Sequence, residues 1–243
     1  MPSKFSLNID SEPHALRPLG LRARWWSALE FLIGGAVVIG HNVLRVLPNE
    51  VPILVVMALV SMRLRSGPWD WSWRGDWSAL GFRRPDSWTR VLLIAIAAAG
   101  LRLLLGAYVI DPVTSHFWPP ARAPSAAGEV AGHLGTALMY LPVIWVFAAF
   151  GEEIGYRGYL MGRAAEWGGG SVAACWAAVI VTSVLFGFGH FYKGPAGILD
   201  SAVAGLILGA AYIVAGRNLW AAILAHGLID TVSLTLLYFG AAG

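Results

Sequence analysis

The sequence predicts an all-α protein, a polytopic transmembrane bundle of about seven helices. The 243 residues are 57% hydrophobic and only 13% charged, whereas soluble domains carry about 25% charged residues. Apolar runs of nearly the ~20 residues that span the ~30 Å hydrocarbon layer recur along the chain. Most tryptophans and arginines lie between those runs, as at membrane interfaces. These observations exclude an ordinary soluble enzyme, a disordered chain and a disulfide scaffold.

The first region is expected to be a polar N-terminal arm, residues 1–24, which contains no apolar core of signal-peptide length. Trp25 and Trp26 mark the point where the chain enters the membrane. Residues 25–133 are expected to hold the N-terminal membrane helices, with a Trp- and Arg-rich loop at 63–90 that lies along a membrane surface. Residues 134–243 are expected to form a separate membrane core.

The expected spans follow the apolar runs, at residues 28–47, 51–62, 91–110, 134–150, 172–190, 196–215 and 219–239. The second run is too short to span alone. It either begins at Val43 with a kink at Pro48, or is a tilted or re-entrant segment. Counting the segment 151–166 separately gives eight spans in place of seven.

The basic residues predict the orientation. With seven spans and a cytoplasmic N-terminus, 13 of the 17 Lys and Arg residues lie inside, three lie outside, and Arg102 lies within a span. This bias follows the positive-inside rule. We therefore expect a multi-pass integral protein of the plasma membrane, in contact with the lipid bilayer. The arginines are scattered and form no clustered basic face, so no nucleic-acid partner is expected.

Three polar clusters interrupt the apolar runs, at residues 151–157, 186–190 and 226–230. An ionised residue at the centre of a span costs ~2.5–3.5 kcal/mol, so such residues need partners and usually mark function. Glu153 and Arg157 are four residues apart and can pair on one helix face, which we interpret as structural. Glu152 points about 100° away and is free for chemistry.

Helical spacing predicts how the clusters meet. The helix that holds Glu152 is expected to continue to about Glu166, turn at glycines 168–170 and return from Val172, which brings Glu152 and His190 to similar depth. His226 and Asp230 share a helix face, so Asp230 either orients His226 or both bind one metal. Their cluster reaches the others only if a helix tilts or if residues 194–200 are re-entrant.

Other polar residues within the apolar runs have simpler interpretations. His41, Asn42 and Arg102 are expected to hydrogen-bond between helices or to extend toward the membrane surface. Cys175, the single cysteine, is expected to pack in the core.

The three clusters together resemble the CPBP family. The patterns are Glu-Glu-x-x-x-Arg at 152–157, Phe-x-x-x-His at 186–190 and His-x-x-x-Asp at 226–230. This family contains CAAX prenyl-protease and bacteriocin-processing (Abi-like) membrane proteins, and is related to the type II CAAX endopeptidases. The similarity covers about residues 134–240, including the run 217–220. It implies that residues 134–243 are the catalytic core of an intramembrane endopeptidase, which hydrolyses a peptide bond of a membrane-associated protein or peptide.

The resemblance also implies roles for the site residues. Glu152 and His190 would activate a water molecule, while His226 and Asp230 would polarise the scissile carbonyl or complete the site. The residues that would support this site are Glu153, Arg157 and Phe186. Two positions depart from the family pattern. The family often has Asn at the position of Asp230. An ionised Asp, unlike Asn, cannot donate a hydrogen bond to an oxyanion. Gly155 stands where larger apolar residues are common, and either loosens the helix or admits close packing.

The mechanism and two rival functions stay open at this stage. Two histidines and two carboxylates are ligand types suited to zinc, so a metal-dependent reaction would use Glu152, His190, His226 and Asp230 as ligands. A reaction without a metal would need only the glutamate and histidine side chains, Glu152 and His190. The rivals are a non-catalytic immunity or scaffolding factor with the same fold and an ion-coupled transporter. A transporter often contains repeated halves, which this sequence lacks.

Overall fold

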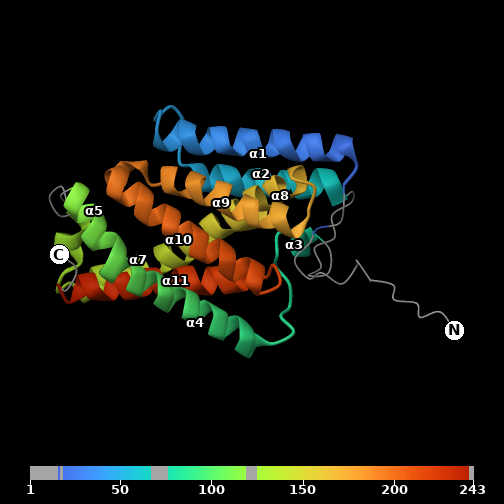
Figure 1. Ribbon diagram of the computed structural model, residues 1–243. Helices are drawn as coiled ribbons and strands as arrows, with labels where there is room; N and C mark the ends of the chain where they lie inside the picture. Colours follow the sequence, from blue (N-terminus) through green and yellow to red (C-terminus); the bar gives the residue numbers. More distant parts are fainter. Residues whose placement is uncertain (1–15, 17–18, 67–75, 119–124, 241–243) are drawn as a thin grey trace.

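The computed structural model describes residues 16, 19–66, 76–118 and 125–240, so the predictions for most of the N-terminal arm and for residues 67–75 fall outside it (Figure 1). Every regular element in those ranges is helical, which confirms the all-α prediction. The elements are α1 (Leu21–Asn42), α2 (Glu50–Ser66), α3 (Asp76–Ala79), α4 (Trp88–Leu105), η2 (Gly106–Ile110), α5 (Asp111–Phe117), α6 (Ser125–Val130), α7 (Leu134–Val143), η3 (Ile144–Leu160), α8 (Met161–Trp167), α9 (Val172–Phe188), η4 (Phe191–Lys193), α10 (Gly194–Val214) and α11 (Leu219–Tyr238).

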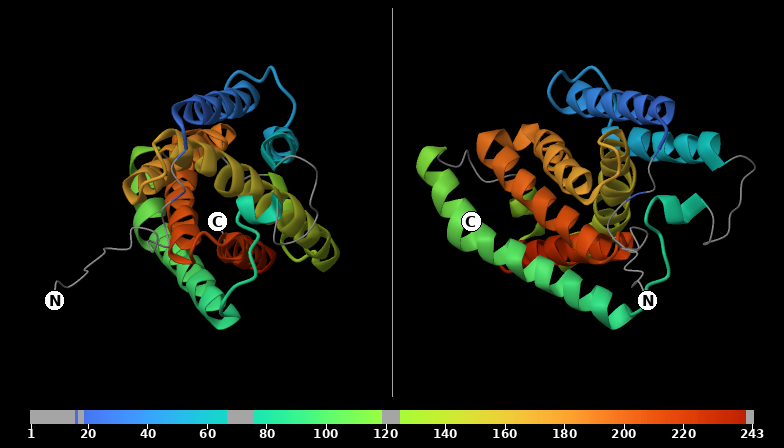
Figure 2. Two further views of the ribbon diagram at one scale, coloured as in Figure 1. Left: turned by 90° about the vertical axis from the view of Figure 1, so that its right-hand side faces the viewer. Right: turned by 45° about the vertical axis from the view of Figure 1, so that its right-hand side comes forward.

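The long helices run back and forth along one direction (Figure 1). The pair α1 and α2 lies on one side of the bundle, and the helix formed by α4, η2 and α5 lies on the opposite side (Figure 2). Between them pack α9, α10, α11 and the helix formed by α7, η3 and α8. Residues 134–238 therefore make the centre of the bundle, with other helices covering two of its sides.

Four helices are long and apolar enough to cross a membrane, by length and composition: 88–117, 134–167, 191–214 and 219–238. The helix α9 is equally apolar but has only 17 residues. The chain is accordingly an integral membrane protein, while the predicted number of seven spans is not confirmed. Residues 151–166 continue the helix that begins at Leu134 without a break, so they do not form an eighth span.

The loop between α1 and α2 corrects one prediction. The helix α1 ends at Asn42, and residues 43–49 form a loop in which Arg45 has a φ of 56°. The second helix therefore does not begin at Val43. It begins at Glu50, where the Asn49 side chain accepts a hydrogen bond from the backbone N–H of Val51 (3.0 Å). This cap satisfies one of the free N–H groups at the helix start.

The turn between α8 and α9 confirms another prediction. The helix ends at Trp167, and Gly169 and Gly170 adopt φ values of 93° and 75°, which glycine accepts without a steric penalty. The Ser171 side chain then accepts a hydrogen bond from the backbone N–H of Ala174 (3.1 Å) and caps α9. The sequence thus sets the antiparallel packing of η3–α8 against α9, on which the register of the predicted site depends.

An ion-pair cluster joins α1, α2 and α8 near this turn. Arg65 of α2 lies 2.5 Å from Glu30 of α1 and 3.1 Å from Glu166 of α8. Arg163 of α8 also lies 3.1 Å from Glu166. Glu30 and Arg163 are buried, where paired charges are far more stable than single ones. The cluster holds the α1–α2 pair on the central helices.

The contact between α9 and α10 depends on two glycines. A Cβ atom on Gly205 would lie 3.0 Å from the Ser183 Cα, and one on Gly209 would lie 2.8 Å from a Val179 methyl carbon. Small residues four apart allow two membrane helices to approach closely. This close approach packs the middle of α10 against the middle of α9.

We expect Gly205→Ile to destabilise the protein by about 1–3 kcal/mol, the usual cost of overpacking a core. The measurement is the midpoint of thermal unfolding of the purified protein in detergent. Gly100→Ile on α4 is the matched control, because a Cβ atom there meets nothing within 4 Å. Equal midpoints for the two variants would contradict the prediction.

Candidate active site

The first motif lies on the π-helical segment η3. Pro142 stands inside the preceding helix α7, where it lacks the N–H that a regular helix requires, and η3 begins two residues later. Such segments are frequent at functional sites. Arg157 Nη1 donates to Glu153 Oε1 (2.6 Å), and Nη2 donates to the Gly205 carbonyl (3.3 Å). The predicted pair of Glu153 and Arg157 is therefore present, and it also ties η3 to α10.

Glu153 also contacts the third motif. His226 Nδ1 lies 2.8 Å from the same Glu153 Oε1, so one carboxylate joins Arg157 and His226. Asp230 Oδ2 lies 3.5 Å from His226 Nε2, which is longer than a normal hydrogen bond. From the sequence, one role considered for Asp230 was to orient His226. In the structure Glu153 makes the short contact, and Asp230 lies near the opposite ring nitrogen.

Phe186 of the second motif lies in the middle of this cluster. Its ring centroid is 5.0 Å from that of Tyr156, 4.8 Å from that of His190 and 6.2 Å from that of His226. The guanidinium carbon of Arg157 lies 4.4 Å from the Phe186 ring centroid, a cation–π contact. The buried ring therefore contacts Arg157 and both histidines.

The contact between Tyr156 and Phe186 also places Glu152 and His190. The two helices are antiparallel, so Glu152 and His190 each lie one turn further in the same direction. His190 Nδ1 is 3.0 Å from the Phe186 carbonyl oxygen. Glu152 Oε2 is buried and has no hydrogen-bond partner, and its carboxylate is within electrostatic range of His226 and Asp230. The four predicted residues thus gather in one region.

The depth of the third motif follows from helix lengths and tilt. The helix α9 has 17 residues and α10 has 21, so α9 ends within the bundle. The helix α10 is continuous from Gly194, so residues 194–200 are its first turns rather than a separate re-entrant segment. In Figure 1 it slopes across α11. From the sequence, the cluster at 226–230 could reach the other two through a tilted helix or through a re-entrant segment at 194–200. The structure shows a tilted helix.

The start of α2 packs against the first motif, which the sequence did not predict. A Cβ atom on Gly151 would lie 2.7 Å from a Val51 methyl carbon, and one on Gly155 would lie 3.0 Å from Leu54 Cβ. Gly155 therefore admits close packing, one of the two roles considered for it. Glu50 is buried and close enough to Tyr156 and Tyr192 to act on both electrostatically. The sequence feature that could have indicated Glu50 is its position directly before the apolar run 51–62.

The polar residues outside the motifs have varied partners. Arg102 lies 2.5 Å from Asp200, which confirms an interhelical contact between α4 and α10. His41 Nδ1 lies 3.0 Å from the Leu47 carbonyl oxygen, and His41 Nε2 lies 3.4 Å from the Glu50 carboxylate, so it connects α1 with α2. Asn42 donates to the carbonyl of Val38 within α1 (3.2 Å), a hydrogen bond inside its own helix.

An apolar groove leads to Asp230. It has a volume of about 220 Å³ and lies between α7–η3 and α11, with α6 at one side. Its lining residues are Val130, Tyr140, Ile144, Asp230, Ser233, Leu234 and Leu237. The side chain of Asp230 is 31% exposed, so an apolar segment in this groove would meet a polar group of the candidate site.

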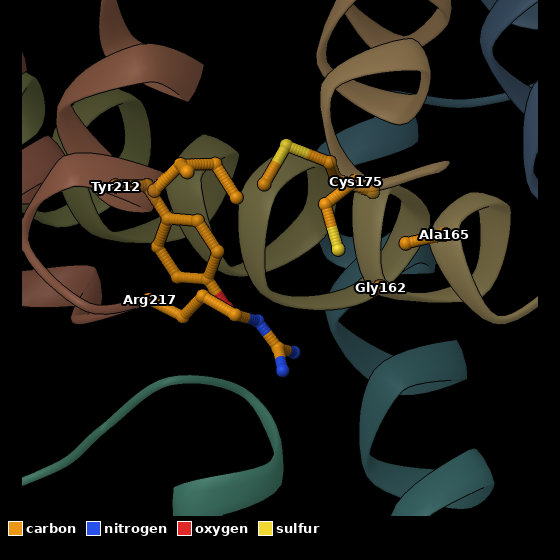
Figure 3. Close-up of a pocket in the computed structure, with 7 residues that line it drawn as sticks. Gly162, Ala165, Cys175, Tyr212 and Arg217 are labelled. Atoms are coloured by element: carbon orange, nitrogen blue, oxygen red, sulfur yellow. The ribbon is translucent and has the colours of Figure 1, made fainter. Parts of the chain in front are cut away.

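A second, much smaller cavity lies away from these residues, where α8, α9 and the end of α10 meet (Figure 3). Its volume of about 10 Å³ is at the lower limit for one water molecule. Cys175 lines it together with Tyr212 and Arg217 and is buried in the core. The prediction that Cys175 packs in the core is confirmed.

The residues present do not form a ready metal site. In the part of the chain that the structure describes, no three His, Cys, Asp or Glu side chains are grouped to hold a metal ion. Structural and catalytic zinc sites have at least three protein ligands. His226 Nδ1 is engaged by Glu153, so only Nε2 of this ring could bind a metal. The four residues predicted as zinc ligands form no such group as they are placed here, and zinc binding stays a prediction.

Comparison with known proteins supports the resemblance drawn from the motifs. Residues 134–232 match a family model described as type II CAAX prenyl endopeptidase Rce1-like. The matched range contains all three motifs. No curated protein and no solved structure matches the chain. The family match confirms the resemblance and supports membrane endopeptidase activity at the level of the family.

Proposed function

We propose that this chain, whose residues 134–232 match the Rce1-like family, hydrolyses a peptide bond of a membrane-associated protein or peptide. One observation carries the proposal. Within the matched range, Glu152 and His190 each lie one turn from the packed rings of Tyr156 and Phe186, beside a buried network of Glu153, Arg157 and His226. A buried charged network is costly in a membrane protein and is a mark of function.

The geometry supports Glu152 as the general base. Its Oε2 has no hydrogen-bond partner, so it is available to accept a proton from water. His190 Nδ1 faces the Phe186 carbonyl, and a carbonyl only accepts, so Nδ1 carries the proton and Nε2 of the neutral ring is an acceptor. A water between these two acceptors would direct a lone pair at the scissile carbonyl. Its O–H bond breaks toward Glu152 as its oxygen bonds to the carbonyl carbon. Glu152 then gives that proton to the amide nitrogen as the C–N bond breaks, which releases the amine and leaves the carboxylate product.

His226 is the residue placed to stabilise the resulting oxyanion. Its Nδ1 donates to Glu153, which holds the ring in place. Both ring nitrogens carry a hydrogen only in the positively charged form of histidine, which is the form we propose here. Its Nε2 lies 3.5 Å from Asp230, longer than a normal hydrogen bond, so that N–H can donate to a substrate oxygen. A fixed donor at the developing negative charge is among the largest contributions to catalysis. Zinc binding stays a prediction, which metal analysis of the purified protein tests.

The proposal is tested by comparing membrane-bound peptides from cells with wild type, Glu152→Ala or His190→Ala at equal protein levels. We expect at least one peptide to be cleaved by wild type and left intact by both variants. Identical cleavage profiles would overturn the protease and would favour a non-catalytic factor of the same fold. The plasma membrane and the cytoplasmic N-terminus remain predictions, which reporter fusions at the two termini test.

A further inference from the structure

A wide apolar groove runs between α4 and α10, and none of the candidate-site residues lines it. Its volume is about 390 Å³, and all nine of its lining side chains are apolar. Four of the nine are alanines, Ala97 and Ala98 on α4 and Ala210 and Ala211 on α10. These small side chains leave a hollow between larger neighbours, which we call the α4–α10 groove.

The α4–α10 groove opens toward the bilayer. Both helices belong to segments that are long and apolar enough to cross a membrane, and α4 lies at the outside of the bundle (Figure 2). Leu101 and Val214, which line the groove, are 50% and 45% exposed. Lipid tails are as apolar as leucine side chains. The occupant of the groove in the membrane is therefore a hydrocarbon chain rather than water.

The groove runs along the two helices, as a lipid chain would. Arg90 of α4 contacts Val214 near one end of the helix pair. Arg102 contacts Asp200 near the other end, so α4 and α10 are antiparallel. The groove extends along α10 from Leu206 to Val214, which is ~12 Å at about 1.5 Å per residue. An acyl chain in it would lie along the helices with one end at Arg90.

Arg90 places a positive charge at that end of the groove. Its Nη2 donates a hydrogen bond to the backbone carbonyl of Val214 (3.1 Å), a lining residue. A guanidinium group has five N–H donors, so one bond to a carbonyl leaves donors for a ligand. Guanidinium groups often bind phosphate through two hydrogen bonds at once. This end of the groove is therefore suited to a phosphate group.

The charges around Arg90 favour an anionic lipid. Residues 83–90 contain three arginines and one aspartate, Asp86, which gives a net charge of +2, and all four side chains are exposed. Trp88, the first residue of α4, is 48% exposed, as is common for tryptophans at the level of lipid headgroups. The net positive charge attracts an anionic headgroup and repels the ammonium group of a zwitterionic one.

We propose that the α4–α10 groove binds one acyl chain of an anionic phospholipid, whose phosphate contacts Arg90. The apolar lining holds the hydrocarbon chain, and the net charge of residues 83–90 selects the anionic headgroup. The lipid would bridge α4 and α10, because both helices line the groove. It would stabilise the protein, since a ligand that binds only the folded state shifts the unfolding equilibrium.

The test measures unfolding midpoints of the full chain in detergent, with added phosphatidylglycerol or with phosphatidylcholine that has the same acyl chains. We expect phosphatidylglycerol to raise the wild-type midpoint by about 2–4 °C more than phosphatidylcholine does. Arg90→Gln is expected to abolish that difference, because it removes the charge at the phosphate. Ala97→Phe is expected to abolish it too, because the ring fills the groove.

Each variant has a matched control, and every shift is taken relative to the same variant without lipid, so a change in stability alone cannot imitate the effect. Arg45→Gln removes an exposed positive charge from the loop between α1 and α2. Ala177→Phe adds a ring at an exposed position of α9. Both controls are expected to keep the wild-type difference between the two lipids.

Three results would overturn the inference. The first is an equal shift with the two lipids in wild type. The second is an equal loss of the difference in Arg45→Gln and Arg90→Gln, because the effect would then come from diffuse surface charge. The third is a difference that survives Ala97→Phe, since the headgroup would then bind without the groove.

Discussion

Replacing Glu153 with alanine is expected to destabilise the protein by about 3–5 kcal/mol, the usual cost of breaking a buried ion pair by removing one partner. Glu153 is completely buried and Arg157 is 2% exposed. The substitution leaves the Arg157 guanidinium without its carboxylate. It also removes the group that holds His226 Nδ1. Three helices, η3, α10 and α11, lose their shared polar contact at once.

The measurement is the unfolding midpoint in detergent and the yield of folded protein. The matched control is Glu152→Ala on the neighbouring residue, where we expect stability close to that of wild type. Glu152 makes no ion pair in the described residues, and its Oε2 has no partner. Equal loss of stability in the two variants would show that the pair of Glu153 and Arg157 is not what holds the helices together.

The local part of the site could be predicted from the sequence. The spacing of Glu153 and Arg157 places them on one face of any helix, and the glycines after Trp167 force a turn. Counting residues from that turn then brings Glu152 level with His190. These predictions need only helix geometry and a short connection. They hold because each depends on neighbours in sequence.

The contacts between distant segments could not be predicted in this way. Glu153 and His226 are separated by 73 positions, and their contact depends on how α11 rotates about its own axis. The approach of α2 likewise depends on glycines 151 and 155 and on a loop that begins at Val43. Hydrophobic periodicity says little about rotation in a membrane bundle, because lipid-facing and core-facing residues are both apolar.

His226→Gln is expected to lower kcat by about 10²–10⁴-fold while costing little stability. A glutamine amide can still donate a hydrogen bond to the Glu153 carboxylate, so Glu153 keeps a buried hydrogen-bond donor at position 226. It cannot carry a positive charge, and its N–H no longer lies at the position of Nε2, which faces the exposed side near Asp230. Loss of a single oxyanion donor costs about 10²–10³ in kcat, and loss of the charge adds to that.

The assay uses the Glu152-dependent peptide, and His116→Gln on the exposed helix α5 is the control. Activity of the His226 variant above about a tenth of wild type would mean that another group stabilises the oxyanion. The same preparations also separate the two mechanisms that the sequence left open. If zinc were bound through His226, the variant would lose metal and activity together. The contact of Glu153 with His226 Nδ1 leaves Nε2 able to bind a metal. Loss of activity with an unchanged metal content would therefore exclude zinc bound through His226.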